Sequence, residues 1–195
     1  STEIIKEWGL SKVEMGYIFS AGLAGMTLGC FLVAPLADKH GRRLIFLLSV
    51  GMITIGMFGV GLGHQYGLML LFRFITGLGI GGILPTMAAT ASEFSNKKYR
   101  DFNVGLVQAG WPIGAILTGL FCAKYIPVYG WHTAFMVAGG ISLLMWVLVY
   151  FYMTDSIDYM LQNPTTDTLP SVNQLLKRMG LPNLETLPVV VKNQE

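Results

Sequence analysis

The sequence predicts an all-α integral membrane protein with five membrane-spanning helices. Hydrophobic residues make up 53% of the 195 residues and charged residues only 12%, about half the charged share of a typical soluble domain. The charges are also clustered, and they leave uncharged stretches close to or above the roughly 20 residues that a helix needs to cross a bilayer. Spanning segments must be helical, because only a helix satisfies its own backbone hydrogen bonds in hydrocarbon.

The uncharged stretches place the five helices. They are bounded by Glu14 and Asp38, Arg43 and Arg73, Arg73 and Glu93, Asp101 and Lys124, and Lys124 and Asp155. Ionised side chains are costly at membrane depth, so these stretches predict helices over 14–37, 43–63, 66–93, 103–124 and 131–153. A large buried core of a soluble helical protein is the alternative, which five such stretches in so short a chain disfavour.

Composition excludes several classes of function. The 13 Lys and Arg residues stand beside 11 Asp and Glu residues, so no basic stripe for nucleic acid remains. The two cysteines lie in apolar runs, and His40, His64 and His132 are scattered without metal-ligand spacing. We interpret these histidines as residues of the membrane interface. We therefore predict no enzyme, no metal site, no cofactor and no nucleic-acid partner.

Charge asymmetry predicts the orientation in a plasma (inner) membrane. The short loops 38–43 and 94–103 hold most of the loop Lys and Arg residues, and the positive-inside rule places them in the cytoplasm. Residues 1–13 are then an external loop, and we expect a helix before them. Residues 154–195 form a cytoplasmic linker, in which apolar residues at helical spacing predict a short amphipathic helix: Val172, Leu175, Leu176 and Met179.

The first motif is a tight cytoplasmic turn between two predicted helices, Ala34-Pro35-Leu36-Ala37-Asp38-Lys39-His40-Gly41-Arg42-Arg43. Gly41 is able to take a positive φ, and Asp38 is the acid beside the two arginines. The run resembles the signature loop of the major facilitator superfamily, a glycine, three residues and then D-R-x-G-R-R. Ala34 stands in place of the glycine and Lys39 in place of the first arginine.

The resemblance implies a conformational latch. In that family the aspartate, here Asp38, meets a helix N-terminus of the other half of the transporter, an attraction between an anion and a helix dipole. Glu93 and Arg100, seven positions apart, resemble the inner charge network of the same superfamily. We expect Glu93 to pair with Arg42, Arg43 or Arg100; a solvated helix end is the alternative.

Arg73 is the candidate binding residue. It lies roughly 10 Å along its helix from Tyr66, and no acid occurs at that depth in a neighbouring span. An arginine there faces either a cavity or, by snorkelling, the headgroups. Gly77 and Gly81 follow at i+4 and i+8, which predicts a side-chain-poor stripe beside the cation, suited to an organic anion. The stretch also resembles the superfamily motif R-x-x-x-G-x-G, which implies proton coupling or carboxylate recognition.

Small residues recur every four positions in the first predicted helix, at Ala21, Gly25 and Gly29. Such a row lets helix backbones approach closely in a membrane, where lipid supplies no hydrophobic drive between helices. We expect this row to be a helix-packing face.

Four segments together resemble the aromatic acid:proton symporter branch of the superfamily: Gly16–Ala24, Ala34–Asp38, Arg73–Pro85 and Leu175–Gly180. The resemblance implies five helices of an incomplete six-helix N-terminal half, and uptake of an aromatic or related carboxylate together with a proton. It also implies partners in the same protein, a first helix that carries an acidic motif and a C-terminal half. Another major facilitator carrier, for a sugar or a drug, and a non-transporting membrane assembly module are the alternatives.

Overall fold

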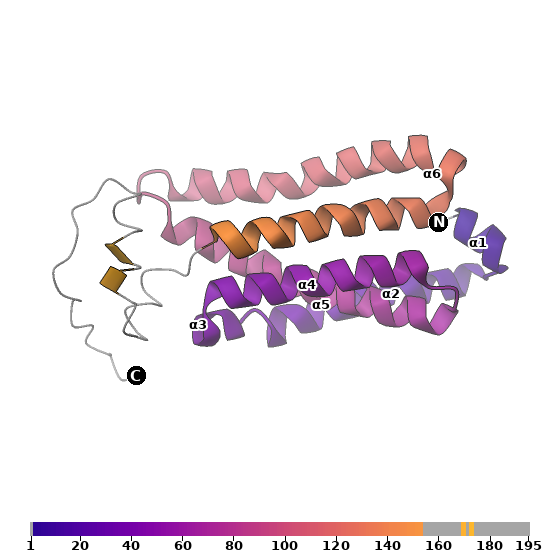
Figure 1. The fold of residues 1–195 in the computed structure, drawn as a ribbon, viewed down its shortest axis with the longest axis horizontal. Helices are drawn as coiled ribbons and strands as arrows, with labels where there is room; N and C mark the ends of the chain where they lie inside the picture. The colour runs from indigo at the N-terminus through magenta and orange to yellow at the C-terminus, as the bar shows by residue number, and fades with distance from the viewer. Residues whose placement is uncertain (1, 154–168, 171, 174–195) are drawn as a thin grey trace. The chain divides into compact units, whose positions relative to one another are not determined.

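A computed structural model describes residues 2–153, 169–170 and 172–173. The chain forms two units, Ser1–Met153 and Thr154–Glu195, and the helical bundle is the first of them. Every regular element in the described part of this bundle is an α-helix (Figure 1). The linker predicted over 154–195 and its amphipathic helix lie almost entirely outside the described residues.

Residues 2–153 form six helices in chain order: α1 (Thr2–Trp8), α2 (Lys12–Leu32), α3 (Leu36–His40), α4 (Arg42–Leu62), α5 (Tyr66–Glu93) and α6 (Arg100–Tyr152). Four of them, α2, α4, α5 and α6, are long and apolar enough to cross a membrane. Helix α6 has 53 residues and reverses at Gly130, where φ is 78° and ψ is 166°. Its two arms, 100–129 and 131–152, lie antiparallel in Figure 1. The predicted helices 103–124 and 131–153 correspond to these arms. The loop expected between them is reduced to a single non-helical residue, Gly130.

The first predicted span ends earlier than expected. Helix α2 begins with a capping box, in which the Glu14 carboxylate accepts the Ser11 backbone N–H at 2.7 Å and the Ser11 hydroxyl accepts the Glu14 N–H at 3.2 Å. It stops at Leu32, five residues before the predicted end, and α3 begins only at Leu36. The reason is Pro35, which has no N–H to donate and disfavours helical geometry in the residue before it.

Helix α5 lies between α2 and α4. A Cβ placed on Gly25 would overlap the carbonyl oxygen of Phe74, and one on Gly29 would overlap that of Leu78. Contacts advance in the same direction on both helices, so α2 and α5 run parallel. Ala21, one turn earlier on α2, is half-buried. Only glycine permits this backbone-to-backbone approach, which is how helices associate inside lipid.

The second arm of α6 packs on α4. The Trp146 indole N–H donates to the Leu47 carbonyl at 3.0 Å, and Gly139 lies against the Phe58 ring. The first arm, 100–129, is exposed along most of its length. Figure 1 shows α1 and the reversal of α6 at one end of this unit and α3 at the opposite end. We call these the α1 end and the basic end, the latter comprising the turn 38–43 and the segment 94–100.

Candidate functional site

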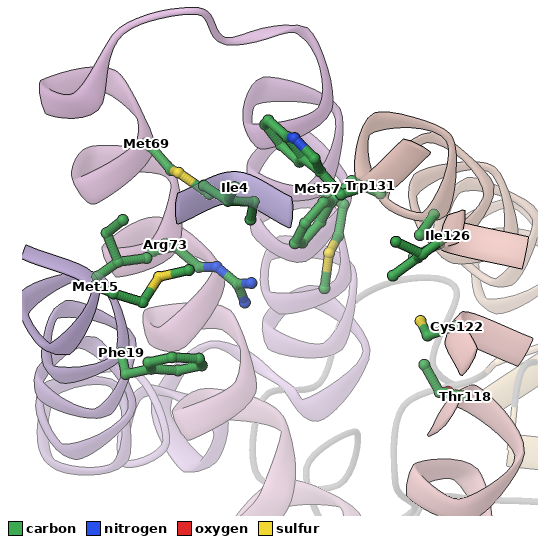
Figure 2. Close-up of a pocket in the computed structure, with 14 residues that line it drawn as sticks. Ile4, Met15, Phe19, Met57, Met69, Arg73, Thr118, Cys122, Ile126 and Trp131 are labelled. Atoms are coloured by element: carbon green, nitrogen blue, oxygen red, sulfur yellow. The ribbon is translucent and has the colours of Figure 1, made fainter. Parts of the chain in front are cut away.

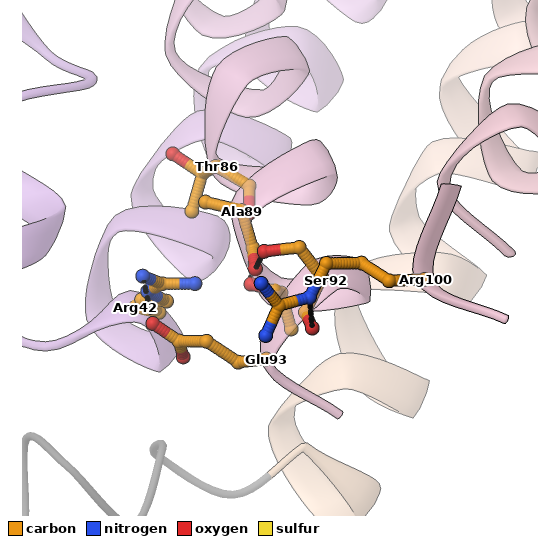
Figure 3. Close-up of polar contacts among 7 residues, drawn as sticks. Arg42, Thr86, Ala89, Ser92, Glu93 and Arg100 are labelled. Atoms are coloured by element: carbon orange, nitrogen blue, oxygen red, sulfur yellow. Dashed lines mark hydrogen bonds and ion pairs between the residues drawn. The ribbon is translucent and has the colours of Figure 1, made fainter. Parts of the chain in front are cut away.

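Charged side chains connect three helices at the basic end. Arg42, the first residue of α4, forms an ion pair with Glu93, the last residue of α5 (Figure 3). Arg43 donates to the Tyr150 carbonyl at 2.7 Å and lies over the Tyr150 ring. Of the three expected partners of Glu93, the structure therefore brings Arg42 to it.

Gly41 and Arg100 complete this arrangement. Gly41 has φ 91° and ψ 143° between α3 and α4, a backbone conformation that favours glycine. Arg100 is bonded to the backbone, because its Nε–H donates to the Ser92 carbonyl at 3.1 Å. The side chain of Asp38, the predicted latch residue, lies outside what the structure describes. The basic turn is thus tied to the ends of both α5 and α6.

A cavity of about 410 Å³ lies between the helices, nearer the α1 end (Figure 2). Its walls are mostly methionine, isoleucine, alanine and aromatic side chains. The full lining is Ile4, Met15, Ile18, Phe19, Met57, Met69, Arg73, Thr118, Cys122, Ile126, Trp131, Ala134, Phe135 and Ala138. No carboxylate belongs to this described lining, and Arg73 is its one charged residue. A volume of this size accommodates a small organic molecule.

The Arg73 guanidinium projects into the cavity, as Figure 2 shows. Its central carbon lies 4.8 Å from the centroid of the Phe135 ring, a cation–π contact worth about 0.5–2 kcal/mol. Its Nε is buried without a hydrogen-bond partner among the described residues, and no ion pair of Arg73 is found among them. A desolvated cation that faces apolar walls is chemically suited to an anion with an apolar body.

Gly77 and Gly81 do not flank this cavity, and the interpretation of these glycines as part of the Arg73 face is wrong. A Cβ on Gly77 would overlap the carbonyl oxygen of Gly22, and one on Gly81 would overlap that of Met26. Both glycines therefore face the backbone of α2. The reason is the 3.6-residue turn, by which a position eight residues on is rotated by about 80°.

A second polar cluster, at the α1 end, was not predicted. The Trp131 indole N–H donates to the Glu7 carboxylate at 2.6 Å, and His132 lies 3.5 Å from the same carboxylate. The hydrogen bond from Trp131 is the main reason that the pKa of Glu7 is lowered. His64 stacks on His132 with ring centroids 5.7 Å apart. The sequence holds no signal for this cluster, because its members come from segments distant in the chain.

Comparisons with known proteins identify the family of this chain. The model of the Major Facilitator Superfamily matches residues 1–188. The chain is 30% identical to the niacin transporter NiaP of Acinetobacter baylyi over 99% of this chain and 45% of that protein. It is 29% identical to the 4-hydroxybenzoate transporter PcaK of the same organism, over 91% of this chain and 38% of PcaK. It is 34% identical to the cis,cis-muconate transport protein of that organism, over 76% of this chain and 36% of that protein.

Solved structures show the same fold. The proton:xylose symporter XylE, bound to 6-bromo-6-deoxy-D-glucose, superposes with a TM-score of 0.76 at 19% identity, over 91% of this chain and 43% of that one. XylE from E. coli in a partially occluded inward-open conformation superposes with a TM-score of 0.74 at 18% identity, over 86% of this chain and 43% of that one. The chain thus spans less than half the length of the relatives that it matches. It belongs to the major facilitator superfamily, a family of membrane transporters rather than enzymes.

Proposed function

We propose that this chain forms most of the N-terminal half of a proton-coupled carrier for aromatic or related organic carboxylates in a plasma (inner) membrane. The observation that carries the proposal is the Arg73 guanidinium, which faces an otherwise apolar cavity without an acid beside it among the described residues. Three relatives support it, because niacin, 4-hydroxybenzoate and cis,cis-muconate are all carboxylates.

In this proposal Arg73 binds the carboxylate and the apolar walls bind the rest of the molecule. A guanidinium presents a planar fork of N–H donors that matches a carboxylate, and the Phe135 ring leaves that fork unpaired while holding it in place. Hydrogen bonds to charged groups contribute about 1.5–3 kcal/mol, which corresponds to roughly 10- to 150-fold in affinity. Phe19 and Phe135 give the cavity two rings for contact with an aromatic substrate.

Transport itself requires more than this chain. Carriers of this kind rock one half against the other around a site near the bilayer midplane, so the C-terminal half is a necessary partner. We infer five membrane crossings here, because α6 reverses at Gly130. We place the acid that exchanges the coupled proton on the helix that precedes residue 1. The lining that the structure describes offers no carboxylate for that task.

We assign the conformational latch to the basic end, which faces the cytoplasm in this proposal. Its members are Asp38, Gly41, Arg42, Arg43, Glu93 and Arg100. The ion pair between Arg42 and Glu93 fixes the turn to α5, the helix that carries Arg73. A change at the latch is thereby transmitted along α5 to the binding residue.

The test is uptake of radiolabelled 4-hydroxybenzoate by cells that express the complete protein. Arg73→Ala abolishes uptake, and Arg73→Lys, which keeps the charge without the fork, leaves residual uptake with a raised KM. Lys124→Ala removes another cation from the membrane region and leaves uptake unchanged, while surface biotinylation verifies equal amounts of each variant. Unchanged uptake in Arg73→Ala contradicts the proposal. Competition by neutral sugars or drugs, with none by benzoate, favours the other carrier classes.

A further inference from the structure

Helix α1 covers the α1 end of the cavity. Ile4, near the middle of α1, is 5% exposed and belongs to the cavity lining. Trp131 of α6 is 2% exposed and lines the same end. Figure 2 shows the ribbon that carries Ile4 passing across the space beside Arg73. A molecule that enters beside Ile4 and Trp131 therefore passes α1.

Besides the apolar packing of Ile4 and Ile5 in the core, two residues of α1 make side-chain contacts with the start of the second arm of α6. The Glu7 carboxylate accepts the Trp131 indole N–H at 2.6 Å and lies 3.5 Å from His132 Nε2. The Trp8 ring meets the Trp131 ring edge-on, with centroids 5.7 Å apart. His132 is itself fixed to the body of the protein, because its Nδ1 lies 2.8 Å from the Gly61 carbonyl oxygen. The attachment joins a small helix to a rigid support.

The connection between α1 and α2 has the properties of a hinge. Gly9 has φ 62°, and no other atom would lie within 4 Å of a Cβ placed on it. Helix α2 begins shortly after it with its own capping box at Ser11, so its N-terminus is stable without α1. A rotation of α1 about Gly9 would therefore leave the capping box at Ser11 in place.

These contacts lead to one inference that goes beyond the proposed transport function. We propose that α1 is a lid on the cavity, held by Glu7 to Trp131 and His132 and released when the Glu7 carboxylate takes up a proton. Protonation removes the anion that strengthens the bond from Trp131, because charge-assisted hydrogen bonds are stronger than neutral ones. His132 faces the same carboxylate and favours its ionised form, so release depends on protonation of Glu7.

The pH range is set by the groups that face Glu7. Among the described residues these are the Trp131 N–H and the two imidazoles His132 and His64, all of which favour the carboxylate form. The pKa of Glu7 is lowered in the closed state, so closure is favoured at and above the ordinary range of glutamate. That contribution is lost as the pH falls through the lowered pKa.

Cys122 makes the lid measurable, because this thiol lines the cavity and is half-buried. The assay is the rate at which a charged, membrane-impermeant thiosulfonate labels Cys122 from outside in the complete protein with every other cysteine replaced by serine. Glu7→Gln mimics the protonated side chain, and Trp131→Phe keeps a ring but removes the donor. Asp101→Asn is the control, because it removes an exposed carboxylate beside the basic end.

We expect Glu7→Gln and Trp131→Phe each to accelerate labelling by about fivefold near pH 7, as for the loss of a half-exposed, charge-assisted hydrogen bond. The double variant gains no more than either single one, and Asp101→Asn matches the wild type. The rate ratio of Glu7→Gln to wild type falls toward one as the pH falls through the lowered pKa of Glu7. Because both proteins carry the same thiol, this ratio is independent of thiol chemistry.

An unchanged labelling rate in either single variant overturns the lid, as does equal acceleration by Asp101→Asn. A rate ratio that stays constant as the pH falls through the lowered pKa of Glu7 overturns the proton-dependent release. The assay contains no substrate, so its outcome is separate from that of the uptake experiment on Arg73.

Discussion

Alanine at Gly77 or Gly81 should loosen the contact between α2 and α5, and the structure sets the size of the effect. A Cβ at Gly77 lies 2.9 Å from the Met26 nitrogen and overlaps the Gly22 carbonyl oxygen, and one at Gly81 lies 2.8 Å from the Cys30 nitrogen. Ordinary contacts need about 3.5–4.0 Å, so the two helices must separate by roughly 1 Å. Overpacking of this kind costs about 1–3 kcal/mol.

The assay is the apparent melting temperature of the purified protein in detergent, together with the KM for uptake. We expect a fall of roughly 2–10 °C for each variant and an unchanged KM, because neither glycine lines the cavity. Gly67→Ala on the same helix is the matched control, since no atom lies within 4 Å of its added Cβ. Its melting temperature should stay level or rise slightly, as alanine is the better helix former.

Two results would refute this reasoning. If Gly77→Ala and Gly81→Ala both kept the melting temperature of the wild type, α2 and α5 would not approach as closely as the structure shows. A raised KM without a lowered melting temperature would return these glycines to the binding face, which their spacing from Arg73 had suggested.

Other substitutions test the charged contacts. Arg42→Glu and Glu93→Arg should each lower the melting temperature, and the double variant with the two residues exchanged should recover most of the loss. A double-mutant cycle should give a coupling energy of about 0.5–1 kcal/mol. No recovery in the double variant would mean that the ion pair is not formed. Glu7 should add thermal stability over Glu7→Gln at neutral pH, and this difference should vanish as the pH falls through the lowered pKa of Glu7; a difference that persists in acid would contradict the contacts of this carboxylate. Phe135→Leu should raise the KM about 2- to 30-fold through loss of the cation–π contact with Arg73, whereas Phe135→Tyr should keep the KM of the wild type. Equal KM values in the two variants would mean that the ring does not act through Arg73.

The spacing of charges predicted most of the helical framework. The third predicted span, 66–93, has the same bounds as α5, because its ends coincide with a polar turn and with the charge at Glu93. The predicted helix ends were wrong where a single residue determines the backbone conformation. Pro35 stops α2 short of its apolar run, and Gly130 reverses α6 without the expected loop.

The site was predictable only in part. Arg73 stands out because one charge lies in a long apolar stretch, and the structure places it in a cavity. Its glycine neighbours were misassigned, since a four-residue spacing drifts around the helix and ends on the α2 side. Glu7 and Trp131 are separated by 124 positions. Contacts of that separation depend on the tertiary fold, which no local pattern encodes.

The most direct test of the central claim is equilibrium binding to the purified complete protein, comparing benzoate with benzamide, a neutral molecule of the same shape. We predict that the wild type binds benzoate at least about 10-fold more tightly than benzamide and that Arg73→Ala removes this preference. Equal binding of the two molecules by the wild type, or an unchanged preference in Arg73→Ala, would contradict the role of Arg73 as the carboxylate-binding residue.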